Sequence, residues 1–106
     1  MLRAVYVRTV KEGVTDDQYV EAWMPEGTAR ADYPARVSVS HSTVNERETV
    51  TVFEFDGDPD HVLDALGALV RPDWRERVAE VIEGTDVETI YVDTVTFGSV
   101  GAPASA

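Results

Sequence analysis

The sequence predicts a single α+β domain whose elements follow in the order strand, helix, strand, strand, helix, strand. The chain has 106 residues, which suits one domain of ordinary size. Four runs rich in β-branched and aromatic residues alternate between two faces, and two segments between these runs carry apolar residues at helical spacing. We expect the domain to cover residues 1–98. The small-residue tail at 99–106 has nothing to bury, and we expect it to be disordered.

The first third of the chain predicts one strand and one short helix. Residues 2–10 alternate between two faces that are both substantially apolar, as expected of a strand. Thr15 and Gln18 have the spacing of a capping box, which begins a helix that Pro25 ends. The segment 25–34 is longer than most connections, so it is either a lid over a site or a plain surface loop.

The rest of the chain predicts a hairpin, a divided helix and a last strand. Two alternating runs within residues 37–55 flank a turn and predict a β-hairpin. A helix begins at Pro59, is interrupted at Pro72 because proline lacks a backbone N–H donor, and then continues to Gly84. Residues 87–97 are predicted to close the domain as a strand.

This order is the ferredoxin-like βαββαβ plan, in which a four-stranded antiparallel sheet carries two helices on one face. The other sheet face is left uncovered. Apolar residues nevertheless occupy both faces; in the third predicted strand, Phe53 and Phe55 oppose Val50 and Val52. An uncovered apolar face is typical of a partner surface, so we expect a homodimer in which two sheets pack face to face.

This order, with both sheet faces apolar, resembles the dimeric α+β barrel superfamily, which includes antibiotic-biosynthesis monooxygenase-like and muconolactone isomerase-like proteins. The resemblance covers about residues 2 to 98 and rests on architecture, not on a specific motif. It implies a small cavity that takes a hydrophobic, often aromatic, substrate, and for some relatives it implies chemistry without a bound cofactor. The haem-degrading branch is disfavoured, because its asparagine, tryptophan and histidine set has no assured match in this chain.

Composition narrows the class of partner. The formal net charge is −11, from 20 acidic against 9 basic residues, which opposes binding to nucleic acid or to anionic membrane surfaces. Cysteine is absent, which excludes thiolate chemistry and agrees with a cytoplasmic location. No apolar run approaches the roughly 20 residues of a membrane span. Motifs for nucleotide cofactors, serine hydrolysis and zinc proteolysis are absent, so we expect no cofactor.

The stretch DGDPDH, which begins at Asp56, raises the question of a metal site. An EF-hand loop from Asp56 would need glycine at its sixth place and glutamate at its twelfth, where this chain has His61 and Gly67. Asp58 instead suits a helix N-cap, with Pro59 at the first helical position. We therefore predict a helix start and no metal.

A small set of polar and aromatic residues forms the candidate site. The candidate catalytic residues are Arg8, His41 and Asp93, and the candidate substrate-binding residues are Tyr6, Trp74 and Tyr91. The first three are ionisable residues within predicted strands, where a charge is costly unless it is paired or lies at a wet cavity. Trp74 follows the helix interruption, where a bend can open the mouth of a pocket, although such aromatic residues are more often part of the core.

The first and last predicted strands should be antiparallel neighbours, which places Arg8 and Asp93 within reach of each other. This ion pair is either structural or functional. In the functional interpretation, Arg8 holds a substrate oxygen, His41 or Asp93 moves a proton, and Tyr91 donates a hydrogen bond.

Two functions agree with these features. The first is a small-molecule enzyme, monooxygenase-like or isomerase-like, with a hydrophobic pocket. The alternative is a non-catalytic homodimeric binding or regulatory module, in which the apolar sheet face serves association alone.

Overall fold

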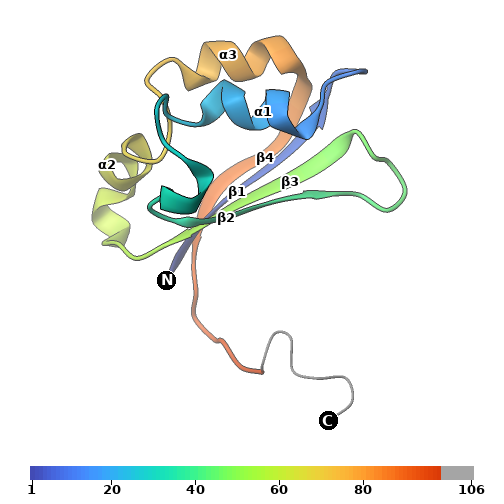
Figure 1. Cartoon of the computed structure of the whole chain (residues 1–106). Coiled ribbons are helices and arrows are strands. Elements are labelled where there is room, and N and C mark those ends of the chain that lie inside the picture. The colour runs from blue at the N-terminus through green and yellow to red at the C-terminus, as the bar shows by residue number, and fades with distance from the viewer. Residues whose placement is uncertain (99–106) are drawn as a thin grey trace.

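The computed structural model describes residues 1–98, and the predicted disordered tail at 99–106 lies outside the described residues. The elements are β1 (Leu2–Val10), α1 (Asp16–Trp23), η1 (Arg30–Asp32), β2 (Arg36–His41), β3 (Glu48–Phe55), η2 (Pro59–His61), α2 (Val62–Gly67), α3 (Trp74–Val81) and β4 (Ile82–Val92). Both η elements are single 3-10 turns. The strands form one antiparallel sheet in the order β2-β3-β1-β4. Figure 1 shows α1 and α3 side by side over one face of this sheet, so the predicted ferredoxin-like α+β fold is confirmed.

Local signals begin the helices where the sequence predicts. The Thr15 hydroxyl accepts a hydrogen bond from the Gln18 backbone N–H, and the Gln18 side chain accepts one from the Thr15 backbone, which completes the capping box. The predicted division of the second helix is also confirmed, because α2 ends at Gly67 and α3 begins at Trp74. Residues 68–73 connect these two helices.

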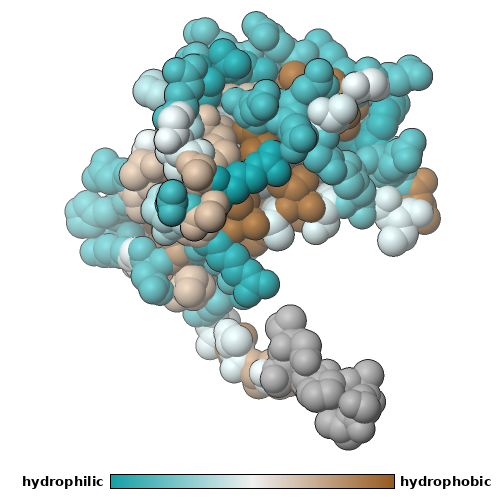
Figure 2. Space-filling view, in the orientation of Figure 1, coloured by the Kyte–Doolittle hydropathy of each residue, from teal (hydrophilic) through white to brown (hydrophobic). Residues whose placement is uncertain are grey.

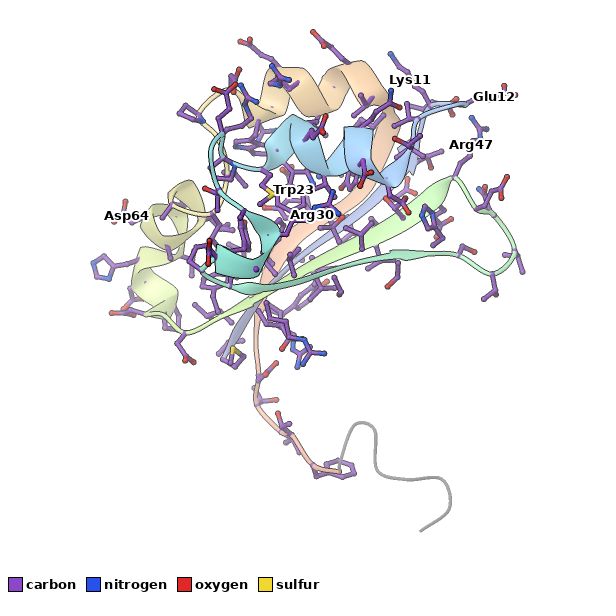
Figure 3. All side chains as sticks on the ribbon, in the orientation of Figure 1. Lys11, Glu12, Trp23, Arg30, Arg47 and Asp64 are labelled. Atoms are coloured by element: carbon purple, nitrogen blue, oxygen red, sulfur yellow. The ribbon has the colours of Figure 1, made fainter. Side chains whose placement is uncertain are left out.

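The core lies between the sheet and the helices. Alternate residues of β1 and β3 point into it, as the burial of both strands shows. Trp23 of α1 is 2% exposed and packs edge-to-face on Phe53, with ring centroids 4.9 Å apart. Figure 3 shows Trp23 between α1 and the sheet. These contacts fix α1 above the central strands.

No helix covers the opposite face of the sheet in Figure 1. This open face carries a strip of valines. Val5 pairs with Val52, while Val7 lies between Val50 and Val87. Because directly opposite residues in an antiparallel pair share a face, these five side chains lie together on the open side.

The last strand differs from its predicted bounds at both ends. β4 begins at Ile82, directly after α3, because Ile82 pairs with Val10 at the far end of β1; Gly84 lies inside the strand and does not end the helix. The strand ends at Val92, because its partner there is Leu2, the first residue of β1. Residues 93–98 lead away from the sheet in Figure 1.

Within residues 1–98, no helix combines the length and the apolar character needed to span a membrane.

Candidate functional site

A cavity of about 490 Å³ lies beside the gap between α2 and α3. It is lined by Tyr6, Leu63, Leu66, Gly67, Val70, Trp74, Arg75, Glu88, Thr89 and Ile90. These residues come from β1, from α2 and α3, from the connection between these two helices, and from β4. The cavity therefore has the predominantly apolar wall and the few polar groups that are typical of a small-molecule site.

The cavity exists because the second helix is divided. α2 is short and ends at Gly67, which adds no side chain to the wall. A Cβ atom at Gly67 would meet no atom within 4 Å apart from its chain neighbours and the backbone of its own helix, so open space lies next to it. Trp74 begins α3 on the other side of the gap, and its ring meets the Tyr6 ring at a centroid distance of 6.4 Å. The two aromatic residues form one continuous wall.

A buried arginine lies behind this aromatic wall. Arg8 is 3% exposed, and its guanidinium carbon is 4.4 Å from the ring centroid of Tyr6 and 5.6 Å from that of Trp74. Its Nη1 donates a hydrogen bond of 2.9 Å to the Tyr19 hydroxyl, which lies 2.8 Å from the Thr51 hydroxyl. Arg8 thus joins a polar network inside the core.

The charge of Arg8 has no direct anionic partner within the part of the chain that the structure describes. No Asp or Glu oxygen there lies within 4.0 Å of its side-chain nitrogens, and its buried Nε has no hydrogen-bond partner. A buried cation without a counter-ion is costly in free energy. Arg8 is therefore a functional candidate, because packing alone does not explain why a charged side chain is buried there.

Tyr6 supplies a hydrogen-bond donor to the cavity. Burial raises the pKa of the Tyr6 hydroxyl above its usual value, although the nearby Arg8 charge opposes that shift. The hydroxyl is therefore protonated at neutral pH. No other group in residues 1–98 hydrogen-bonds to it, so it is free to donate to a ligand oxygen.

Glu88 is a cavity residue that the sequence reasoning missed. It lies directly opposite Tyr6 in the pairing of β1 with β4, so both side chains are on the helix-bearing face. Its carboxylate is 3.5 Å from Nη2 of Arg75, whose guanidinium stacks on Trp74 at 4.5 Å from the ring centroid. The signal that could have found Glu88 is the apolar Ile90 two residues later, which marks the buried face of this strand.

The predicted pair between Arg8 and Asp93 is wrong. Asp93 instead accepts a hydrogen bond of 2.9 Å from Nε of Arg3, and the strand register sets Arg8 opposite Thr85. Tyr91 lies opposite Arg3 on the open face. The sheet therefore separates both Tyr91 and Asp93 from the cavity, and neither can act there together with Arg8.

His41 lies on the helix-bearing face but at the edge of the sheet, two strands away from Arg8. Its Nε2 is 2.6 Å from a carboxylate oxygen of Asp16, and its Nδ1 is 2.6 Å from the Glu46 carbonyl oxygen. Both partners are acceptors, so the arrangement suits the doubly protonated imidazolium. The structure thus places His41 in a clasp between the hairpin and α1, outside the large cavity.

This clasp predicts a pH-dependent stability. The hydrogen bond to Asp16, above all, raises the folded-state pKa of His41 above its usual value of 6.5. The clasp therefore stabilises the fold fully below the unfolded-state pKa, and this contribution is lost as the pH rises through the folded-state pKa. Because the pair is largely exposed, we expect only about 0.5 kcal/mol.

The measurement is the difference in melting temperature between the wild type and His41→Gln at pH 5.5 and at pH 8.5. We expect the larger difference at pH 5.5. Asp16→Asn should reduce the same difference, because it removes the partner carboxylate. A difference that is equal at both pH values would contradict a charged clasp.

A second cavity of about 330 Å³ lies between α1 and the edge strand β2. It is lined by Asp16, Val20, Trp23, Met24, Arg30, Tyr33, Val37 and Val39. Hydrophobic residues reach the surface between α1 and the sheet edge in Figure 2. Arg30 and Tyr33 come from the long 25–34 connection, whose Tyr33 hydroxyl donates to the Leu69 carbonyl. This segment therefore packs over the second cavity and not over the larger one.

The DGDPDH stretch is a helix start, as predicted. A carboxylate oxygen of Asp58 accepts a hydrogen bond of 2.9 Å from the Asp60 backbone N–H, and Pro59 begins the 3-10 turn that leads into α2. His61 lies 3.2 Å from the same carboxylate group. In the described part of the chain, no three His, Asp or Glu side chains gather as metal ligands.

Comparison with known proteins supports the fold and goes no further. No family model matches this chain, and no curated protein sequence matches it. The fold is similar to the crystal structure of an uncharacterized NIPSNAP domain protein from Burkholderia xenovorans, with a TM-score of 0.58 and 13% sequence identity. The similarity covers 93% of this chain and 100% of the other. At this identity it shows the ferredoxin-like α+β class alone.

Proposed function

We propose that this protein binds a small hydrophobic, aromatic molecule in the large cavity and acts on it as an isomerase-like enzyme. The observation that carries the proposal is the aromatic wall of Tyr6 and Trp74 with the buried cation of Arg8 behind it. An apolar cavity alone would suit many ligands. A cavity that also holds an unpaired donor and a carboxylate suits chemistry at a carbonyl group.

The reaction we propose is a proton transfer next to a ligand carbonyl. The carboxylate of Glu88 removes a proton from the carbon next to the carbonyl group. The electron pair of the broken C–H bond forms a C=C bond, and the π pair of the C=O bond moves to the oxygen, which gives an enolate. The Tyr6 hydroxyl donates a hydrogen bond to that oxygen, and the nearby Arg8 charge favours its negative form. In a ligand whose carbonyl group is conjugated with, or lies next to, a C=C bond, this enolate extends over a second carbon. Return of the proton from Glu88 to that carbon re-forms the carbonyl group, shifts the C=C bond and gives the isomer. No other reactant is consumed.

Filling the cavity tests binding without removing any contact. Gly67→Leu should abolish the binding of aromatic ligands such as 2-naphthol, because the new side chain enters the open space beside α2. Its control is Ala68→Leu, the same change at the next residue, which is exposed and outside the cavity wall. Calorimetric titration measures both. Equal affinity in the two variants would show that the ligand binds elsewhere.

Isotope exchange tests catalysis. The wild type should accelerate the exchange of the acidic C–H protons of 1-tetralone for deuterium in D2O, followed by NMR. Glu88→Gln should slow this exchange by at least about 100-fold, the usual contribution of a general base. Glu76→Gln, on an exposed position of α3, should leave it unchanged. Binding without any acceleration in the wild type would favour the non-catalytic binding module.

We also propose that the protein is a homodimer that pairs through the open face of its sheet. Support comes from the valine strip formed by Val5, Val7, Val50, Val52 and Val87, which has no helix over it. A second copy of this chain offers the same strip, so two copies are self-complementary about a two-fold axis. The helices and the large cavity lie on the other side of the sheet and stay accessible in such a pair.

A further inference from the structure

We infer that the large cavity prefers a ligand bound as an anion, such as an aromatic carboxylate or an acidic phenol. Its charged oxygen would lie against Tyr6 and Trp74, in the place that the enolate oxygen takes in the proposed reaction. The inference rests on the proposed function, because it assumes that this cavity is the binding site. It adds the charge of the ligand, which the apolar wall does not define.

The first argument is an excess of hydrogen-bond donors on the wall. Neither the Tyr6 hydroxyl nor the Trp74 indole N–H has a hydrogen-bond partner among residues 1–98. The Glu88 carboxylate, which also lines the cavity, already lies 3.5 Å from Arg75. A ligand with acceptor oxygens would satisfy the two free donors. A ligand that offers only donors would leave them unpaired.

The second argument is the local charge. The guanidinium groups of Arg8 and Arg75 lie 5.6 and 4.5 Å from the centroid of the Trp74 ring, and Glu88 is the acidic side chain in the cavity wall. The Trp74 ring thus has two positive charges near it, one in the cavity wall and one behind it, against one carboxylate in the wall, in a protein with a net charge of −11. An anion bound here would give the buried Arg8 the opposite charge that the described residues do not provide.

The third argument distinguishes the charge of Arg8 from that of Arg75 by how strongly salt screens each of them. Arg8 is buried, so salt in solution screens its charge weakly, whereas the Arg75 side chain is 72% exposed and is screened strongly. If Arg8 supplies the preference for an anion, that preference should persist at high ionic strength. The effect of salt on this preference can be measured on the wild-type protein, so the test does not depend on how a substitution at Arg8 affects folding.

The experiment compares three ligands of the same shape by calorimetric titration at pH 7.5. They are the anion 2-naphthoate, the neutral 2-naphthamide and the cation (2-naphthyl)methylammonium. We expect 2-naphthoate to bind at least about tenfold more tightly than the amide, as a buried charge of opposite sign predicts, and the cation to bind most weakly. The ratio between anion and amide should hold at 0.05 and at 0.5 M salt, survive in Arg75→Gln and fall toward one in Arg8→Met.

Other results of this titration would contradict the anion preference, the proposed function, or both. Equal binding of the anion and the amide would overturn the inference and leave the cavity as a site for neutral aromatic ligands. A preference that disappears at high salt, or in Arg75→Gln, would also overturn it, because the exposed arginine would then be the source. No binding of any of the three ligands would count against both the inference and the proposed function.

Discussion

Replacing Arg8 with methionine is expected to keep the protein folded and to raise its free energy of unfolding by about 1 kcal/mol, while it weakens the binding of an aromatic acid. Methionine is shorter than arginine, but it replaces the apolar stem of the side chain between the aromatic rings and carries no charge. The Arg8 guanidinium has lost its water, has no carboxylate within salt-bridge distance among the described residues, and carries an unpaired Nε. The Tyr19 hydroxyl keeps Thr51 as a hydrogen-bond partner after the change.

Urea denaturation of the ligand-free protein measures this effect, with Arg75→Met as the control at an exposed position over the same Trp74 ring. The control should leave stability nearly unchanged. A loss of more than about 2 kcal/mol in Arg8→Met would mean that the cation–π contacts and the Tyr19 hydrogen bond outweigh the burial of the charge. Arg8 would then be a structural residue of the core.

Replacing Val52 with aspartate is expected to convert a dimer into monomers that remain folded. Val52 lies opposite Val5 on the open face, so the change would bury a carboxylate at the centre of the proposed interface. An unpaired charge there would cost several kcal/mol of association free energy. The side chain faces away from the helices, so the core of each monomer would be undisturbed.

Sedimentation measures the mass in solution, which should fall from twice the chain mass to 11.7 kDa in Val52→Asp. Val44→Asp is the matched control, because Val44 is 94% exposed in the connection between β2 and β3 and lies outside the valine strip. It should remain a dimer. A wild-type protein that is monomeric at high concentration would contradict the proposed pairing.

Alternation and capping residues predict most of this fold because both are local signals. The two faces of β1 and β3, the helix start at Thr15 and the break near Pro72 all follow from residues close together in sequence. The end of α3 does not. The chain passes from Val81 directly into β4 without a turn, and Gly84, which suits a helix end, is held in the strand by its pairing with Thr9.

The site is less predictable, because its geometry depends on strand register. The sequence alone identifies Arg8 as a candidate because it is a charged residue inside a strand, and Trp74 because it is an aromatic residue at a helix break. The local sequence does not define which residues of β4 lie on the same sheet face as Arg8. A shift of one residue in the strand pairing moves every side chain of β4 to the other face. The register therefore excludes Tyr91 from the cavity and brings in Glu88.

The most direct test of the central proposal, a ligand in the large cavity, uses the two tryptophans of the chain. Their indole N–H signals can be followed separately by NMR while 2-naphthoate is added. Trp74 lines the cavity, whereas Trp23 is buried in the core outside it. We predict that the Trp74 signal moves, that the Trp23 signal stays, and that Gly67→Leu abolishes the movement. A ligand that binds while the Trp74 signal stays in place would contradict the account.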